Sequence, residues 1–215
     1  MADRALLRLS GTLLLIGFVV SYLAQLPHPG GGATYEETFA NYAASAVADW
    51  TAIHLWQFVS EAVLLAGLLV LLFALHVTEG IPRWVGFFGA ISVGMALALA
   101  GVLAAVDGVA LKQAVDAWAS APAAEKASRL ASAEAIRWLE FGINSYWQYM
   151  RGLALVLYAI VIAFTGRVPR PIGLFMGVAG LCFIVLGWMV GTTGFTAART
   201  LPTDVGYGCL LAFTI

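Results

Sequence analysis

Two charged residues fall inside long apolar runs, where an ionised side chain costs about 2.5–3.5 kcal/mol to insert and therefore needs a partner. Glu61 lies 15 residues before the inner end of its run at His76. Arg151 lies the same number of residues before the inner end of its own run at Gly166. At 1.5 Å per helical residue, both lie about 22 Å from the same membrane boundary. Equal depth and opposite charge predict a Glu61–Arg151 ion pair within the bilayer.

Polar side chains extend each charged residue into a stripe on one helix face. His54, Gln57 and Glu61 are spaced i, i+3, i+7, and Asn144, Gln148 and Arg151 continue a stripe that starts at Arg137 and Glu140. By the same helical rise, Asp107 lies about 13 Å above Glu61, near the height of His54. These positions predict a polar pocket that opens toward the outer side. Its residues are His54, Gln57, Glu61, Asp107, Asn144, Gln148 and Arg151.

Three interpretations of this pocket are open at the level of sequence. It binds or transports a small solute or a proton. Alternatively, its polar residues only lock the helices of a structural or accessory subunit together. In the third interpretation it is an enzyme site in which Glu61 or Asp107 acts as acid or base. A water-accessible cavity beside Glu61 favours the first and third interpretations, whereas a closed ion pair favours the second.

The histidines do not suggest a metal or haem site. His54 and Glu61 are two helical turns apart, about 10.5 Å, which is too far for them to share one metal ion. His28 falls in a Pro/Gly loop and His76 at the opposite boundary, so no second histidine is expected near His54. The P-loop, HExxH and GxSxG signatures are also absent. We therefore expect no metal and no cofactor.

Membrane-spanning helices must position the pocket residues. Of 215 residues, 61% are hydrophobic and 11% are charged, whereas about 25% are charged in soluble domains. A run of about 20 apolar residues is long enough to cross a bilayer. Such runs predict five full spans and a partial sixth, at residues 5–26, 50–76, 84–106, 147–165, 172–190 and 205–215. The expected fold is all-α, a polytopic transmembrane helix bundle that forms a single domain.

Two segments differ from a simple span. Residues 113–146 are charged and helix-forming, which predicts an extramembrane amphipathic helix leading into span four. Residues 205–215 make about half a span, so we expect a chain truncated within its sixth helix. Interfacial anchors are expected at the tryptophans near span ends, which are Trp50, Trp56, Trp84, Trp138 and Trp147.

Small residues in span five predict close helix packing. Gly173, Gly177, Gly180, Gly187 and Gly191 recur at spacings that place glycines on the helix surface toward a neighbour. Helix backbones approach each other at such residues, because lipid provides no hydrophobic driving force between helices. We expect Gly177 and Gly187 to lie too close to a neighbouring helix for a bulky side chain.

Basic residues in the short loops predict the orientation. Arg4, Arg8, Arg83, Arg167 and Arg170 fall on one side of the predicted spans. The loop after span one carries acidic residues and no Lys or Arg. Residues 113–146 carry basic residues on the other side, mixed with acidic ones. This pattern predicts a cytoplasmic N-terminus.

Two short segments resemble a group of uncharacterised bacterial multi-pass membrane proteins, a domain of unknown function. They are Val106-Asp107-Gly108-Val109-Ala110-Leu111-Lys112 and Glu134-Ala135-Ile136-Arg137-Trp138-Leu139-Glu140. The resemblance extends to helix order and loop lengths over most of the chain. It implies a location in the bacterial cytoplasmic (inner) membrane and no particular activity or cofactor.

The partners implied by the sequence are few. The lipid bilayer is the expected environment, and the polar pocket suggests a small-molecule ligand. A net charge of -1 without a basic cluster gives no indication of nucleic-acid binding. The sequence does not indicate an oligomeric state.

Overall fold

The computed structural model describes residues 3–214, which form helices and no strand. Five of these helices are long and apolar enough to cross a membrane, so the chain is a multi-pass helical membrane protein. The five are α1 (Arg4–Gln25), α3 (Val47–Ala74), α4 with its continuation (Gly80–Ala119), α6 (Lys126–Thr165) and α7 (Arg170–Thr193). The expected partial span corresponds to α8 (Thr200–Thr214), and its last residue, Ile215, lies outside the described residues.

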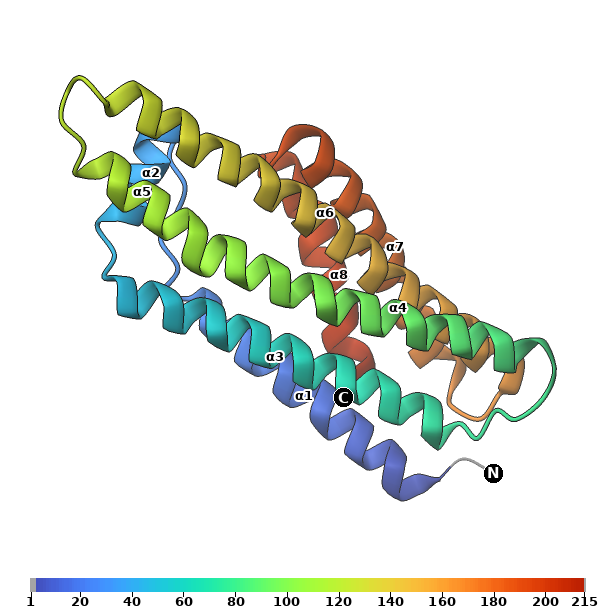
Figure 1. Ribbon diagram of the computed structural model, residues 1–215. Helices are drawn as coiled ribbons and strands as arrows, with labels where there is room; N and C mark the ends of the chain where they lie inside the picture. Colours follow the sequence, from blue (N-terminus) through green and yellow to red (C-terminus); the bar gives the residue numbers. More distant parts are fainter. Residues whose placement is uncertain (1–2, 215) are drawn as a thin grey trace.

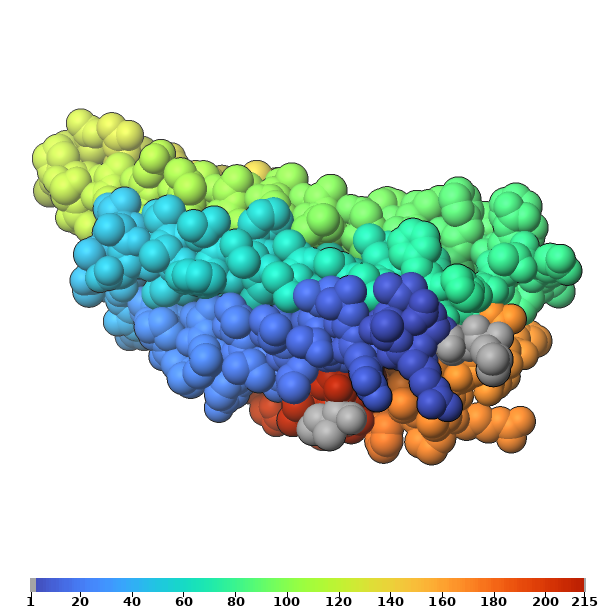
Figure 2. Space-filling model, turned by 90° about the horizontal axis from the view of Figure 1, so that it is seen from below, coloured from blue at the N-terminus to red at the C-terminus, as the bar shows by residue number. Residues whose placement is uncertain are grey.

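The long helices run side by side (Figure 1), and the contacts between neighbouring helices arrange them in a ring. Around it, α1 packs along α3, α3 along α4, α4 along α6, and α6 along α7. The ring closes because α8 packs against α7 and also contacts α1. Figure 2 shows α1 on one face, between α3 and the α7–α8 side of the bundle. Large apolar side chains such as Phe73, Leu174 and Trp188 are exposed, as expected for a lipid-facing surface.

A short helix, α2 (Tyr35–Ala43), lies between the first two spans, where the sequence predicted only a loop. Thr34 caps it, because the Thr34 hydroxyl accepts a hydrogen bond from the Glu37 amide at 3.2 Å. Thr-x-x-Glu is the spacing of a capping box, a signal that was present in the sequence. Buried Phe39 and Tyr42 fasten α2 to an aromatic cluster. The helix therefore covers one end of the bundle, beside α5 (Figure 1).

The expected helix leading into span four is present as the first part of α6, but it does not extend over all of residues 113–146. The third long helix continues through a π-helical segment, η1 (Val106–Leu111), into α5 (Lys112–Ala119). The chain then turns, and α6 begins at Lys126 and runs unbroken for 40 residues. Pro122 lies in this turn. Because proline lacks the amide proton and restricts the residue before it, a continuous helix is disfavoured here. The turn projects beyond the other helices in Figures 1 and 2.

The glycines of α7 permit close contact with α6 at some positions. A Cβ at Gly180 would lie 2.7 Å from the Gly152 carbonyl oxygen, and one at Gly187 would lie 2.8 Å from a backbone oxygen of α6. Gly177 differs, because among the described residues a Cβ there would meet only Ala159, at 3.4 Å. Gly177 borders an apolar groove of about 460 Å³. The expectation for Gly187 is confirmed, and that for Gly177 is wrong because the α6 surface recedes at this turn.

Candidate functional site

A cavity of about 1130 Å³ extends from the end covered by α2 into the ring of helices. All six helices of the ring contribute to its lining, together with the loop after α1. Six of the seven residues predicted for the pocket line it, namely His54, Gln57, Glu61, Asp107, Asn144 and Gln148. The seventh, Arg151, lies behind this lining and is 1% exposed. The helical periodicity of the sequence therefore predicted correctly which helix faces line this cavity.

The floor of the cavity contains the predicted ion pair. Arg151 Nη1 lies 3.3 Å from Glu61 Oε2, and both side chains are buried. Arg151 Nη2 also donates a hydrogen bond to Gln148 Oε1 at 2.9 Å. On the other side, Trp147 Nε1 donates to Glu61 Oε1 at 3.3 Å. Arg151 Nη2 also lies 3.5 Å from the Tyr207 hydroxyl, so the two charges contact each other and three further polar groups.

Aromatic rings surround the Arg151 guanidinium group. Its Cζ atom lies 3.8 Å from the Phe183 ring centroid, 4.3 Å from that of Trp147 and 5.5 Å from that of Tyr207. These distances are within the range of about 6 Å over which cations are attracted to ring faces. Trp147 therefore points into the bundle, and its expected role as an interfacial anchor is wrong. The rings explain how a guanidinium group is accommodated at this depth.

A second polar cluster lies higher in the cavity, where α3 meets η1. His54 Nε2 is 3.0 Å from Asp107 Oδ2, and His54 is 3% exposed. The other ring nitrogen, Nδ1, donates a hydrogen bond to the Trp50 carbonyl oxygen at 2.8 Å. The similar heights calculated for His54 and Asp107 are thus realised as direct contact.

The π-helical turn of η1 positions Asp107 through its backbone. Trp50 Nε1 donates to the Asp107 carbonyl oxygen at 2.9 Å, so Trp50 is also an interior residue and not an interfacial anchor. The Thr51 hydroxyl donates to the carbonyl oxygen of Gly108 at 3.4 Å. A Cβ at Gly108 would lie 2.6 Å from the His54 Cβ, so only glycine allows the two segments to approach this closely. Single π-helical turns are frequent at functional sites.

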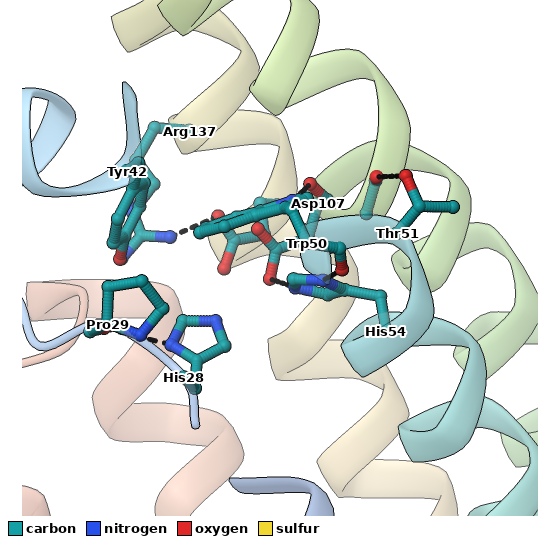
Figure 3. Close-up of polar contacts among 10 residues, drawn as sticks. His28, Pro29, Tyr42, Trp50, Thr51, His54, Asp107 and Arg137 are labelled. Carbon is teal, nitrogen blue, oxygen red and sulfur yellow. Dashed lines mark hydrogen bonds and ion pairs between the residues drawn. The ribbon is translucent and has the colours of Figure 1, made fainter. Parts of the chain in front are cut away.

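The loop after α1 places His28 beside this cluster (Figure 3). The His28 ring centroid lies 5.4 Å from that of His54 and 5.2 Å from that of Trp50. His28 Nδ1 donates a hydrogen bond to the Pro29 carbonyl oxygen at 2.9 Å. Burial lowers the pKa of His28, which keeps its ring neutral at pH 7. The expectation that no second histidine lies near His54 is wrong, because helical periodicity does not show how a Pro/Gly loop folds back.

Arg137 and Glu140 complete the outer part of the cavity. Arg137 Nη1 lies 2.5 Å from Glu140 Oε2, and Nη2 donates to the Tyr42 hydroxyl at 3.1 Å. The same guanidinium group lies over the ring of Phe195, 4.9 Å from its centroid. Burial raises the pKa of Tyr42, so its hydroxyl stays protonated. Both charged residues belong to the polar stripe predicted from the sequence, but the contact of Arg137 with Tyr42 of α2 depends on how the loop after α1 folds.

The chain was compared with protein-family models, curated proteins and solved structures, and none of the three comparisons finds a match. Its function is therefore argued from the geometry of the cavity. Three features of that cavity carry information: its depth, the paired charges at its floor, and the cluster of two histidines and one carboxylate above them.

Proposed function

We propose that the protein binds a small polar solute in this membrane-embedded cavity, with a preference for cations. The observation that carries the proposal is that Glu61, although ion-paired with Arg151, lines a cavity of about 1130 Å³. A purely structural ion pair needs no such space beside it. Polar groups inside a membrane are costly, and they commonly mark solute or proton pathways.

The charges around the cavity support a cationic solute. Five carboxylates and two guanidinium groups line it. Arg151 and Arg137 form ion pairs with Glu61 and Glu140 respectively. Among the described residues that line the cavity, more carboxylates than guanidinium groups remain outside these arginine–carboxylate pairs. Aromatic walls add attraction for a cation. The charged lining residues are Glu36, Glu61, Asp107, Glu140, Asp204, Arg137 and Arg199.

The proposal is tested by chemical access to Gln57, in a variant in which Cys182 and Cys209 are replaced by alanine. A membrane-impermeant thiol reagent should modify Gln57→Cys from one side of the membrane only. Ethanolamine, a small cation, should slow this reaction, whereas glycolate, an anion of similar size, should not. The matched control is Ala154→Cys, a fully buried position on α6 that does not line the cavity and should stay unmodified.

Each alternative predicts a different result. A Gln57→Cys thiol that reacts no faster than Ala154→Cys would support the structural interpretation and contradict the proposal. Protection by glycolate but not by ethanolamine would contradict the preference for cations. A protecting solute that is recovered chemically altered would support the enzyme interpretation.

We also propose that the N-terminus is cytoplasmic and that the protein resides in the bacterial cytoplasmic membrane. The basic loop residues share one end of the bundle (Figure 1). At that end the Asp3 amide, just before α1, donates to the Ala74 carbonyl oxygen at 3.0 Å. Arg167, between α6 and α7, donates to the carbonyl oxygen of His76 at 2.7 Å. A shared basic end supports an inward orientation under the positive-inside rule.

Cysteine labelling tests this orientation. Ala40→Cys on exposed α2 should react with an impermeant reagent in intact cells, and Ile81→Cys at the start of α4 should react only after the membrane is opened. Both variants use the background without native cysteines. Ile81 is preferred to Gly80 because Gly80 has a positive φ of 70°, which a side chain would strain. The opposite labelling pattern would reverse the orientation without changing the fold.

A further inference from the structure

We infer that His28, His54 and Asp107 form a binding site for a divalent transition-metal ion at the outer end of the cavity. One ligand atom from each residue lies within 4.8 Å of the others. The residues come from three separate segments, which are the loop after α1, helix α3 and the π-helical turn η1 (Figure 3). This inference deepens the proposed function, since it names one cation that the cavity would hold.

The hydrogen bonds of both histidines leave one nitrogen of each ring available. A carbonyl oxygen can only accept, so Nδ1 of His54 must donate to Trp50, and Nδ1 of His28 must donate to Pro29. In the neutral ring the Nε2 atom then carries the lone pair. Metal-bound histidines show this pattern, in which a backbone carbonyl oxygen fixes the tautomer through the second nitrogen.

The contact between His54 and Asp107 requires a shared cation. His54 Nε2 and Asp107 Oδ2 lie 3.0 Å apart, and two lone pairs at that distance repel each other. A proton or a metal ion between them removes the repulsion. Within residues 3–214, however, His54 Nε2 and Asp107 Oδ1 are buried and make no hydrogen bond. Unsatisfied buried groups of this kind need an explanation, and the nearby His28 ring makes a metal ion the better one.

The set of ligand atoms indicates which ions would bind. Two imidazole nitrogens and one carboxylate suit Zn²⁺, Fe²⁺, Co²⁺ or Mn²⁺, whereas Ca²⁺ and Mg²⁺ prefer oxygen ligands and Cu⁺ prefers sulfur. Three protein ligands leave at least one coordination position for water or a solute, as in catalytic rather than structural sites. The free position would face the cavity.

Binding of a metal ion would require the three ligand atoms to move slightly closer together. At metal–ligand distances of about 2.1 Å in tetrahedral geometry, the ligand atoms would lie roughly 3.4 Å apart. His54 and Asp107 are held by α3 and η1, so His28 would have to approach them by on the order of 1 Å. It sits in a loop with three glycines, Gly30 to Gly32, which allows such a shift. Arg137, a basic side chain that lines the same cavity, is compensated by Glu140 at 2.5 Å.

Metal titration of the purified protein tests the site. After treatment with a chelator, the detergent-solubilised chain should bind one Co²⁺ ion, with visible absorption bands of a four- or five-coordinate complex, and Zn²⁺ should displace it. His28→Gln and Asp107→Asn should each weaken Co²⁺ binding at least about tenfold, since even the loss of an outer-shell partner typically costs 10–100-fold. His76→Asn is the matched control, because it removes a histidine from the opposite end and asparagine tolerates the positive φ of 47° at this position.

The variants distinguish the possible results. Wild-type affinity in both His28→Gln and Asp107→Asn would overturn the metal site. His28 lies in a loop, so its substitution keeps the test valid even where changes at His54 disturb folding. Failure of the wild-type protein to bind Co²⁺ would also overturn the site. Protection of Gln57→Cys by ethanolamine is measured without metal, and therefore tests the proposed function separately.

Discussion

Replacing Glu61 with glutamine is expected to lower the free energy of unfolding by about 3–5 kcal/mol. The change leaves the Arg151 guanidinium group buried without its carboxylate, and a guanidinium group does not lose its proton. Gln148 and the aromatic rings remain in contact with it, which favours the lower end of this range. At about 2–4 °C per kcal/mol, the melting temperature in detergent should fall by on the order of 10 °C.

The partner substitution separates a coupled pair from two independent residues. Arg151→Met should destabilise the protein less than Glu61→Gln does, because Glu61 borders the cavity and can be hydrated there. The double variant carries neither charge, and most of the lost stability should return. Strictly additive losses in the double variant would show that the two side chains do not interact in the membrane.

An exposed ion pair in the same chain provides the control for this cycle. Glu125, which is the N-cap residue of α6, and Arg129 in its first turn lie 3.2 Å apart, and each side chain is 52% exposed. Glu125→Gln should change the free energy of unfolding by less than about 1 kcal/mol, as is usual for pairs in contact with water. A loss as large as that of Glu61→Gln would mean that burial does not explain the effect.

The floor of the cavity was predictable because it depends on regular helices alone. A constant rise per residue fixes the depth of Glu61 and Arg151, and the helical repeat fixes which polar residues share their faces. The facing arrangement of α3 and α6 then follows from the cost of leaving either charge unpaired. The 3.3 Å contact between the two side chains agrees with this reasoning.

The outer part of the site was not predictable in the same way. His28 belongs to a Pro/Gly loop, whose path depends on how α2 packs and not on any periodicity. The height of Asp107 followed from the regular helix before it, but its place in a π-helical turn, which sets the direction of its side chain, gave no periodic signal. Trp50 and Trp147 stand near span ends, where outward-facing anchors and inward-facing hydrogen-bond donors look alike in sequence. Only the Thr34 and Glu37 capping signal could have revealed that a helix closes this end.

Substituting leucine for Gly180 is expected to be among the most damaging single changes at the contact between α6 and α7. A Cβ at this position would lie 2.7 Å from the Gly152 carbonyl oxygen and 2.8 Å from a methyl group of Val156. The first obstacle is backbone, which cannot rotate away, so α6 and α7 would have to separate. Overpacking of this kind typically costs about 1–3 kcal/mol, and a longer side chain against backbone should reach the upper end.

Gly177→Leu is the matched control, because it introduces the same side chain on the same helix, three residues away. The added side chain can enter the groove of about 460 Å³ that Gly177 borders, so the melting temperature should change by no more than about 2 °C. Equal losses at both positions would show that leucine in α7 is harmful in itself, independent of the contact with Gly152. If neither variant were destabilised, α6 and α7 would not approach as closely as 2.7 Å implies. In that case α7 would no longer hold Phe183 against Arg151, and the packing proposed for the cavity floor would have to be revised.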